Sequence, residues 1–263
     1  MGILNVTPDS FSDGGQFSTL ETALTQARAL VAAGADILDI GGQSTRPSAP
    51  GVSVQAELDR VLPVIQAVRR EMDIPISVDT TRSTVAKLAI AAGADLVNDV
   101  SGATYDAAML PTVAGLHVPI ILMHLRGTPQ TMQQMTDYVD LVGEVTEFLR
   151  ARAGAAITAG INPNHIALDP GIGFAKTFEQ NLELLRRLPE FRAIGCPLLV
   201  GTSRKSFIGH ILNQPNPKAR IWGTAATCCA AIAGGADILR LHDVQELRDV
   251  CRVADALWRT EQG

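Results

Sequence analysis

The segment Ala33-Gly-Ala-Asp-Ile-Leu-Asp-Ile40 has two close relatives further along the chain. They are Ala92-Gly-Ala-Asp-Leu-Val-Asn-Asp99 and Gly234-Gly-Ala-Asp-Ile-Leu-Arg-Leu241. In each segment, an alanine-rich helix is predicted to end near a glycine that can adopt the left-handed conformation common after helix C-termini. A continuous apolar run follows, as expected for a parallel strand buried on both faces. This internal similarity indicates a repeated strand–helix unit.

Five further apolar runs have the length of strands, at residues 2–5, 75–79, 119–123, 166–169 and 198–201. Apolar periodicity and capping residues predict the intervening helices, at residues 18–33, 54–72, 83–92, 106–115, 137–159, 178–188, 219–233 and 244–259. Eight strands alternating with eight helices predict an α/β fold, the (β/α)8 TIM barrel. An open, doubly wound sheet is the alternative. No linker or charge shift divides the chain, so we expect a single domain over residues 1–263.

The composition is that of a soluble globular protein with a sizeable core, because 46% of the 263 residues are hydrophobic and 19% are charged. A net charge of −5 argues against a nucleic-acid-binding surface. The four cysteines lack CxxC spacing, so we expect reduced thiols and a cytoplasmic protein. No apolar run reaches the length that a bilayer requires, so no membrane partner is expected.

The first fifteen residues, Met1-Gly-Ile-Leu-Asn-Val-Thr-Pro-Asp-Ser-Phe-Ser-Asp-Gly-Gly15, combine the end of a predicted strand with a long polar loop. Pro8 removes a backbone donor and the two final glycines permit positive φ, so neither helix nor strand continues here. A long loop attached to a buried strand is usually functional. A flexible N-terminal tail is the alternative interpretation.

Polar residues stand at the carboxyl ends of the predicted strands, where TIM barrels build their active sites. They are Asn5, Asp39, Asp79, Asn98, His124, Asp169, the run Ser203-Arg-Lys-Ser206, Arg240 and His242. Burying several acids and amides together is costly unless a cation or a ligand pairs with them. Two ligands would satisfy them: a metal ion, or a heterocycle such as an aminopyrimidinone that presents adjacent N–H donors to a carboxylate.

Basic residues near the same strand ends predict an anion site. Pro47 restrains Arg46 to an extended loop conformation. Arg240 and His242 alternate along one predicted strand, so both side chains can point to the same side. Together with Lys205, these residues have the charge to hold a pyrophosphate. The loop that leads from strand seven into a helix offers backbone amides and a hydroxyl to a carboxylate or phosphate.

The segment Gly171-Ile-Gly173 begins like a dinucleotide-binding fingerprint, but Lys176 occupies the place of the third glycine. No acidic ribose ligand follows at the required distance, so this weak signal does not predict a nucleotide cofactor.

Taken together, these motifs resemble dihydropteroate synthase, a family of pterin-binding (β/α)8 enzymes of folate synthesis. The resemblance runs over nearly the whole chain, through residues 2–15, 38–47, 77–79, 98–99, 168–174, 203–206 and 240–242. It implies condensation of 6-hydroxymethyl-7,8-dihydropterin pyrophosphate with p-aminobenzoate to give 7,8-dihydropteroate and pyrophosphate, with Mg²⁺ as cofactor. A methyltetrahydrofolate methyltransferase with a related barrel and a catalytically inactive pterin-binding protein are the alternatives.

The resemblance also implies a role for each matching residue. The implied pterin site consists of Asp79, Asn98, Asp169 and Lys205. The implied pyrophosphate site consists of Asn5, Arg46, Arg240 and His242, with Mg²⁺ near Asn5 and Asp13. The implied p-aminobenzoate site consists of Phe11, Thr45, Arg46, Pro47, Phe174 and Ser206. The implied catalytic residues are Asn5, Asp13, Arg46, Lys205, Arg240 and His242.

Further expectations follow from the family pattern. The resemblance implies a dissociative displacement in which pyrophosphate leaves first, a homodimer, and competitive inhibition by sulfonamides that mimic p-aminobenzoate. Two features depart from the pattern. The family usually has a short β-hairpin before its first strand, where this sequence starts, so we expect a barrel without that hairpin. Gln43 stands where the family usually has Glu, which removes one negative charge near Arg46.

Overall fold

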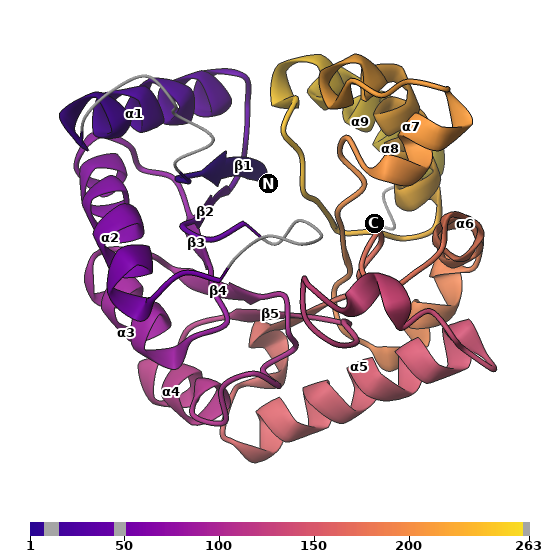
Figure 1. The fold of residues 1–263 in the computed structure, drawn as a ribbon, viewed down its shortest axis with the longest axis horizontal. Coiled ribbons are helices and arrows are strands. Elements are labelled where there is room, and N and C mark those ends of the chain that lie inside the picture. The colour runs from indigo at the N-terminus through magenta and orange to yellow at the C-terminus, as the bar shows by residue number, and fades with distance from the viewer. Residues whose placement is uncertain (8–15, 45–50, 260–263) are drawn as a thin grey trace.

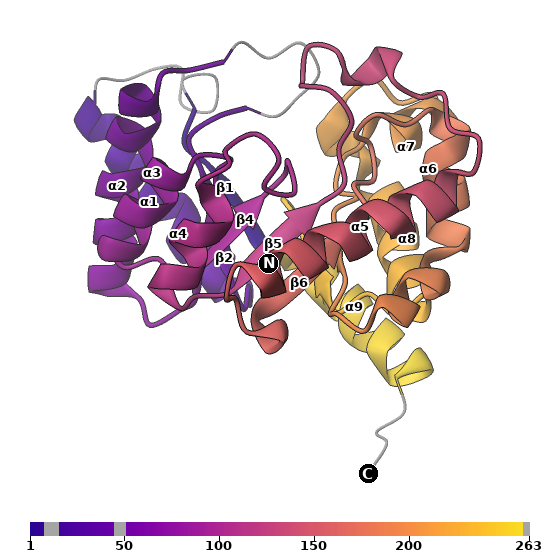
Figure 2. The same ribbon diagram turned by 90° about the horizontal axis from the view of Figure 1, so that it is seen from below.

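The computed structural model describes residues 1–7, 16–44 and 51–259. Parallel strands lie at the centre of the molecule, and helices surround them on the outside (Figures 1 and 2). The strands are β1 (Gly2–Asn5), β2 (Leu38–Gly41), β3 (Ile76–Asp79), β4 (Leu96–Asp99), β5 (Ile120–Met123), β6 (Ile166–Asp169), β7 (Leu199–Val200) and β8 (Ile238–Leu239). Each of them overlaps a predicted strand in the sequence.

The eight strands form two parallel sheets, which are joined at both edges into a closed barrel. Strands β1 to β6 make one parallel sheet in chain order, and β7 pairs with β8. A parallel bridge between Leu168 and Leu198 joins β6 to the start of β7. A second bridge, between Gly2 and Leu241, joins β1 to the end of β8. We call these two bridges the seams of the barrel. They close the ring, which confirms the (β/α)8 barrel and excludes the open sheet.

The helices follow the predicted order, with one addition. Within the described ranges they are α1 (Gln16–Ala32), α2 (Val54–Glu71), α3 (Ser83–Ala91), α4 (Met109–Leu116), α5 (Leu141–Thr158), α6 (Phe178–Arg186), α7 (Ser206–Ile211), α8 (Ile221–Ala233) and α9 (Val244–Trp258). The predicted list lacked α7, whose six residues are too few to show a clear apolar period. The additional helix begins at Ser206, directly after the loop that leaves β7.

The three repeated segments behave as predicted. Gly34, Gly93 and Gly235 adopt positive φ angles of 90°, 116° and 92°. Each lies just after a helix end and turns the chain back toward the next strand. A side chain at any of these positions would be strained, so the repeat preserves a turn as well as an apolar run.

The barrel interior is apolar at one end and polar at the other. Leu96, Ala167 and Ile238 belong to an interior cluster that also contains Met1, Ile37, Ile121 and Leu199. Residues two positions further along a strand point to the same side. The strands that carry Leu96, Ala167 and Ile238 therefore lead to Asn98, Asp169 and Arg240. This apolar floor supports a polar layer at the carboxyl ends of the strands.

In the part of the chain that the structure describes, no helix combines the length and apolar character needed to cross a membrane.

Candidate active site at the mouth of the barrel

The structure describes nine of the predicted site residues and gathers most of them at the carboxyl ends of the strands. Asp79, Asn98 and Asp169 are buried, and Asn5, Phe174, Lys205, Arg240 and His242 are partly buried. Ser206, the first residue of α7, is exposed. The remaining predictions, Phe11, Asp13, Thr45, Arg46 and Pro47, lie outside the described residues.

Arg240 connects two acids across the interior of the barrel. Its Nε donates to Asp39 Oδ2 over 2.5 Å, and its Nη2 donates to Asp79 Oδ2 over 2.8 Å. Asp39 is fully buried and Asp79 almost so. Asp39 was predicted to stand at a strand end, but the family resemblance implies no role for it. The structure shows that it is a main partner of Arg240, so the predicted cation is already paired with acids of the protein.

Asn98 extends this network toward β4. Its Nδ2 donates to Asp39 Oδ2 over 3.2 Å. Burial raises the pKa of Asp79 to about 7, although the positive charge of Arg240 opposes the shift. Two carboxylates that share one guanidinium cannot both be fully compensated. The Asp79 carboxyl therefore favours a ligand whose N–H donors stabilise its ionised form.

Asp169 occupies a different environment on the opposite side of the network. Its Oδ1 accepts the backbone N–H of Gly171 over 2.7 Å. Burial raises its pKa to about 6, against that hydrogen bond and the charges of Lys205 and Lys176. No ion pair to Asp169 forms within 4.0 Å among the described residues. This buried carboxyl is therefore stabilised mainly by its loop and by more distant charge.

Lys205 lies over the ring of Phe174, with Nζ 4.0 Å from the ring centroid. Gly173 has a φ of 85°, and a Cβ there would lie 2.8 Å from Lys205 Cδ. A glycine is therefore required for the loop to approach the lysine side chain. Burial lowers the pKa of Lys205 to about 8. The contact joins a residue of the implied pterin site to a residue of the implied p-aminobenzoate site.

Lys176 is a buried cation that the sequence analysis did not place in the site. Its Nζ donates to the carbonyl of Phe174 over 2.9 Å and lies 3.0 Å from His124 Nδ1. Desolvation lowers the pKa of Lys176 to about 7, while Asp169 raises it. In the sequence, this residue is marked only by its charge, directly after the apolar run Gly171-Ile-Gly-Phe-Ala175.

His242 is held by the loop that follows β7. Its backbone N–H donates to Ser203 Oγ over 3.1 Å, and its ring Nδ1 lies 2.9 Å from the same oxygen. Arg204 Nε donates to Asp243 Oδ2 over 2.9 Å, which joins the same two loops a second time. Arg240 and His242 were predicted on one strand. Instead, β8 ends at Leu239, and the next strand contact is the seam at Leu241.

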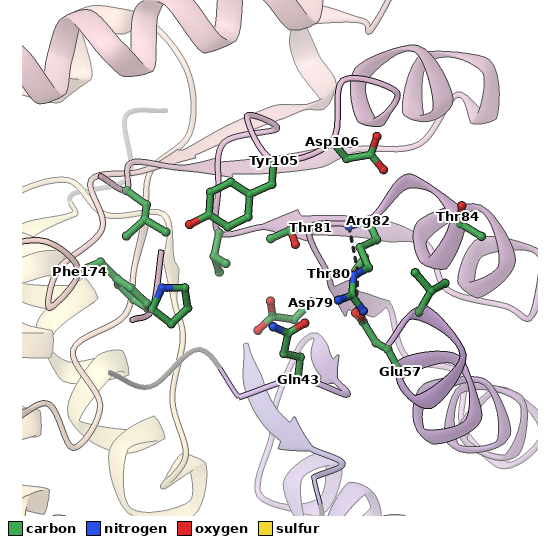
Figure 3. A pocket seen from close by; sticks show the side chains of 14 residues that line it. Gln43, Glu57, Asp79, Thr80, Thr81, Arg82, Thr84, Tyr105, Asp106 and Phe174 are labelled. Carbon is green, nitrogen blue, oxygen red and sulfur yellow. Dashed lines mark hydrogen bonds and ion pairs between the residues drawn. The ribbon is translucent and has the colours of Figure 1, made fainter. Parts of the chain in front are cut away.

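A cavity of about 350 Å³ opens beside Asp79, between the loops that follow β2, β3, β4, β5 and β6. Figure 3 shows Gln43, Tyr105 and Phe174 around it. On one side, Arg82 Nη1 donates to Glu57 Oε2 over 2.7 Å, and Thr80 Oγ1 donates to Glu57 Oε1 over 2.6 Å. This size is at the lower end of the range for small-molecule sites.

The described residues form no group of three or more His, Cys, Asp and Glu side chains that could hold a metal by themselves. Mg²⁺ is commonly bound by one or two protein oxygens together with substrate phosphates and water. Asn5 has a hard amide oxygen at the end of β1 and fits such a partial ligand set. The second predicted ligand, Asp13, lies outside the described residues.

Comparison with known proteins identifies the class of enzyme. A family model described as "Pterin binding enzyme" matches residues 1–242. The chain is 62% identical over 259 residues to dihydropteroate synthase of Synechocystis sp., covering 98% of this chain and 90% of the relative. It is 46% identical to dihydropteroate synthase of Bacillus subtilis, covering 98% and 87%. The chain belongs to the pterin binding enzymes.

Within that class it belongs to the dihydropteroate synthase family, and solved structures agree. A Clostridium difficile dihydropteroate synthase crystallised in the presence of pteroic acid has a TM-score of 0.94 and 44% identity, covering 99% of this chain and 96% of that one. A Xanthomonas albilineans dihydropteroate synthase with 4-aminobenzoic acid has a TM-score of 0.93 and 43% identity, covering 99% and 93%. A Yersinia pestis relative in complex with a sulfonamide drug has a TM-score of 0.93 and 42% identity, covering 99% and 94%.

Proposed function

We propose that this enzyme condenses 6-hydroxymethyl-7,8-dihydropterin pyrophosphate with p-aminobenzoate, giving 7,8-dihydropteroate and pyrophosphate in folate synthesis. The observation that carries the proposal is the contact between Lys205 and Phe174. It brings the proposed pterin pocket and the proposed p-aminobenzoate pocket side by side, as a bond-forming reaction between the two molecules requires. Relatives crystallised with 4-aminobenzoic acid and with 7,8-dihydropteroate support the same substrates.

The pterin binds among Asp79, Asn98, Asp169 and Lys205 in this proposal. Two carboxyl groups with raised pKa values suit a heterocycle that presents several N–H donors, because hydrogen bonds to the ionised form lower a carboxyl pKa. The Asn98 amide supplies one further acceptor and a donor. Lys205 closes the pocket from the β7 side and offers its ammonium to a ring acceptor.

The pyrophosphate binds on the β8 side, where Arg240 and His242 follow the strand, with Asn5 and Arg46 as further ligands. Asn5 and Asp13 would hold Mg²⁺, which neutralises charge on a pyrophosphate when it is bound. Arg240 approaches the anion while it remains tied to Asp39 and Asp79. That pairing fixes the guanidinium in place, so little conformational freedom is lost when the substrate binds.

The p-aminobenzoate ring binds against Phe174, with Phe11, Thr45, Arg46 and Pro47 as further contacts. Ser206 offers a hydroxyl to the carboxylate of the ligand at the start of α7. The pyrophosphate leaves first, and the amine then attacks the pterin methylene cation. Sulfonamides compete for the same pocket, in keeping with the sulfonamide complex of the Yersinia pestis relative.

The decisive experiment supplies the purified protein with the pterin pyrophosphate and Mg²⁺, with and without p-aminobenzoate. Pyrophosphate release that matches dihydropteroate formation is the expected result. A folded protein that binds the pterin but releases no pyrophosphate would instead be an inactive binding protein. Methyl transfer from methyltetrahydrofolate to a corrinoid acceptor, without pyrophosphate release, would establish the related methyltransferase activity.

We further propose a cytoplasmic homodimer. The four cysteines are free, which suits a reducing compartment.

The dimer is supported by a surface of large apolar side chains at the start of α6, in α7 and in α8, where Ile211 is 58% and Trp222 75% exposed. Gly223 of α8 lies against Ile208 of α7 and against Leu212, the residue after α7, so these exposed side chains belong to one surface. Sedimentation of the wild type and of Trp222→Lys tests the dimer; a monomeric wild type contradicts it.

A further inference from the structure

We propose that Ser203 is a positioning residue that fixes His242 as the neutral Nε2–H tautomer, so that the imidazole presents a hydrogen-bond donor to an anion beside it. This inference rests on the proposed pyrophosphate site. It concerns the chain of hydrogen bonds from Ser203 to His242 and does not depend on which acceptor substrate the enzyme uses.

Within the described ranges, the Ser203 hydroxyl has two hydrogen-bond contacts, both to His242. A hydroxyl has one hydrogen to donate and two lone pairs that accept. The backbone N–H of His242 can only donate, so it uses one lone pair of Oγ over 3.1 Å. The His242 ring Nδ1 lies 2.9 Å from the same Oγ. In the described part of the chain, no other group is close enough to accept the hydroxyl hydrogen.

Ser203 is only 6% exposed, so a hydroxyl hydrogen without an acceptor would carry a desolvation cost. Donation from Oγ to Nδ1 avoids that cost. Nδ1 is then an acceptor, and the hydrogen of a neutral imidazole must reside on Nε2. Among the described residues, Nε2 has no hydrogen-bond partner, so its N–H is free to meet a ligand.

The positive charges of Arg204, Arg240 and Lys205 act on the imidazole of His242, and the negative charge of Asp243 opposes them. Burial and these cations lower the pKa of His242 to about 3, against the opposing effect of Asp243. The ring is therefore neutral at physiological pH. A neutral ring can still stabilise an anion, provided that its N–H and not its lone pair faces the ligand. By donating to Nδ1, the hydroxyl of Ser203 keeps the N–H on Nε2, on the side of the ring that meets the ligand.

The backbone supports the same arrangement. Arg204 has a φ of 60°, which is uncommon for a residue with a side chain. Its backbone N–H donates to Thr224 Oγ1 over 3.2 Å, and its side chain reaches Asp243. These contacts hold the chain on either side of the Ser203–His242 pair. The hydroxyl is thus placed by a loop that is anchored to both α8 and the segment after β8.

The test measures the tautomer directly by NMR of protein labelled with ¹⁵N-histidine, with His242→Gln used to assign the signal among the five histidines. At pH 7 the wild type is expected to show an unprotonated Nδ1 and a protonated Nε2. Ser203→Ala should populate both tautomers, and Ser203→Thr, which keeps the hydroxyl, should restore the wild-type pattern. A protonated Nδ1 in the wild type would overturn the inference, even if Ser203→Ala failed to fold.

Calorimetry with inorganic pyrophosphate and Mg²⁺ provides the second readout. Binding is expected to weaken about tenfold in Ser203→Ala and by no more than about twofold in Ser203→Thr. Unchanged affinity in a folded Ser203→Ala would overturn the positioning role. The two proposals fail separately. A wild type that forms no dihydropteroate refutes the proposed reaction, whereas the NMR signals of the ligand-free protein test the tautomer alone.

Discussion

The six-stranded part of the barrel and the two-stranded part bring opposite charges to the same mouth. Strands β1 to β6 carry the acids and amides of the site, namely Asn5, Asp39, Asp79, Asn98 and Asp169, while the loop after β6 adds one buried cation, Lys176. The β7–β8 part carries cations and an imidazole, namely Lys205, Arg240 and His242. The two parts also differ in regularity, because the first six strands have four residues each and the last two have only two.

The two parts are joined by one bridge at each seam, and Arg240 adds ion pairs that cross the interior to Asp39 and Asp79. Arg240, which we propose as a pyrophosphate ligand, therefore also connects the two parts of the barrel through its ion pairs. These ion pairs distinguish Arg240 from Lys205, which has no ion pair within 4.0 Å among the described residues. Four predictions test the contrast.

The largest effect is expected when the pairing across the barrel is broken. Arg240→Met leaves the buried Asp39 and Asp79 without their cation, so the free energy of unfolding should fall by about 3–5 kcal/mol. Urea denaturation at pH 7 measures it. Arg150→Met, at an exposed site of α5, is the matched control and should change stability by less than about 0.5 kcal/mol. Equal stability of the two variants would show that the ion pairs do not hold the parts together.

A second prediction concerns Lys176, a cation buried on the six-stranded side. Its pKa is lowered to about 7 in the fold from an ordinary value of 10.5. Between pH 7 and 10 the unfolded chain therefore binds more protons, so stability should rise with pH. Lys176→Met should reduce that rise by about 3–4 kcal/mol. Urea titrations at pH 7 and pH 10 measure the difference, and an exposed Lys87→Met serves as control. An unaltered rise would mean that Lys176 is not desolvated.

The third prediction separates the effect of a residue on ligand binding from its effect on the stability of the barrel. Lys205→Ala should weaken pterin pyrophosphate binding by more than tenfold, which corresponds to about 1.4 kcal/mol or more. Its stability should change far less than that of Arg240→Met, because Lys205 does not bridge the two parts with an ion pair. Calorimetry and urea denaturation of the same samples measure both quantities. Lys218→Ala, at an exposed position, is the control. Unchanged affinity would remove Lys205 from the pterin site.

The smallest expected effect is the number of protons released when the pterin binds. The pKa of Asp169 is raised to about 6, so at pH 6 about half of its carboxyl groups carry a proton. A pterin that donates hydrogen bonds favours the ionised form, so binding should release about half a proton at pH 6 and less at pH 8. Calorimetry in buffers of different ionisation enthalpy measures the release. Asp169→Asn should abolish this contribution; proton uptake on binding would contradict the proposed contact.

Most of the barrel could be predicted because the helix-ending glycines and the apolar runs in the sequence indicate the same strand–helix repeat. The three glycine turns and the apolar runs after them occur in sequence as they occur in the fold. The short helix α7 escaped detection because six residues show too little periodicity. The strand ends marked the mouth correctly, since position along a strand determines the end of the barrel at which a side chain lies. Whether Arg240 binds pyrophosphate remains a prediction.

Pairings inside the site were harder to predict, because they depend on which side chains meet across the barrel. Asp39 and Arg240 are 201 residues apart, and no local pattern links them. Lys176 faces His124 from a different loop, and its burial became evident only from the packing. The Ser203–His242 bond likewise requires the spatial approach of two loops. Residue type and spacing predicted which side chains lie at the mouth, whereas the contacts between them required the three-dimensional structure.

The seams also have a consequence for the order in which the protein is made. Strands β1 to β6 each pair with a neighbour in the chain, so their ladder can form while synthesis is still in progress. The contacts of Gly2 with Leu241 and of Asp39 with Arg240 require the last strand to have left the ribosome. The acids of the site are thus synthesised long before the arginine that neutralises them. Until Arg240 has left the ribosome, Asp39 and Asp79 lack the guanidinium that pairs with them in the complete barrel.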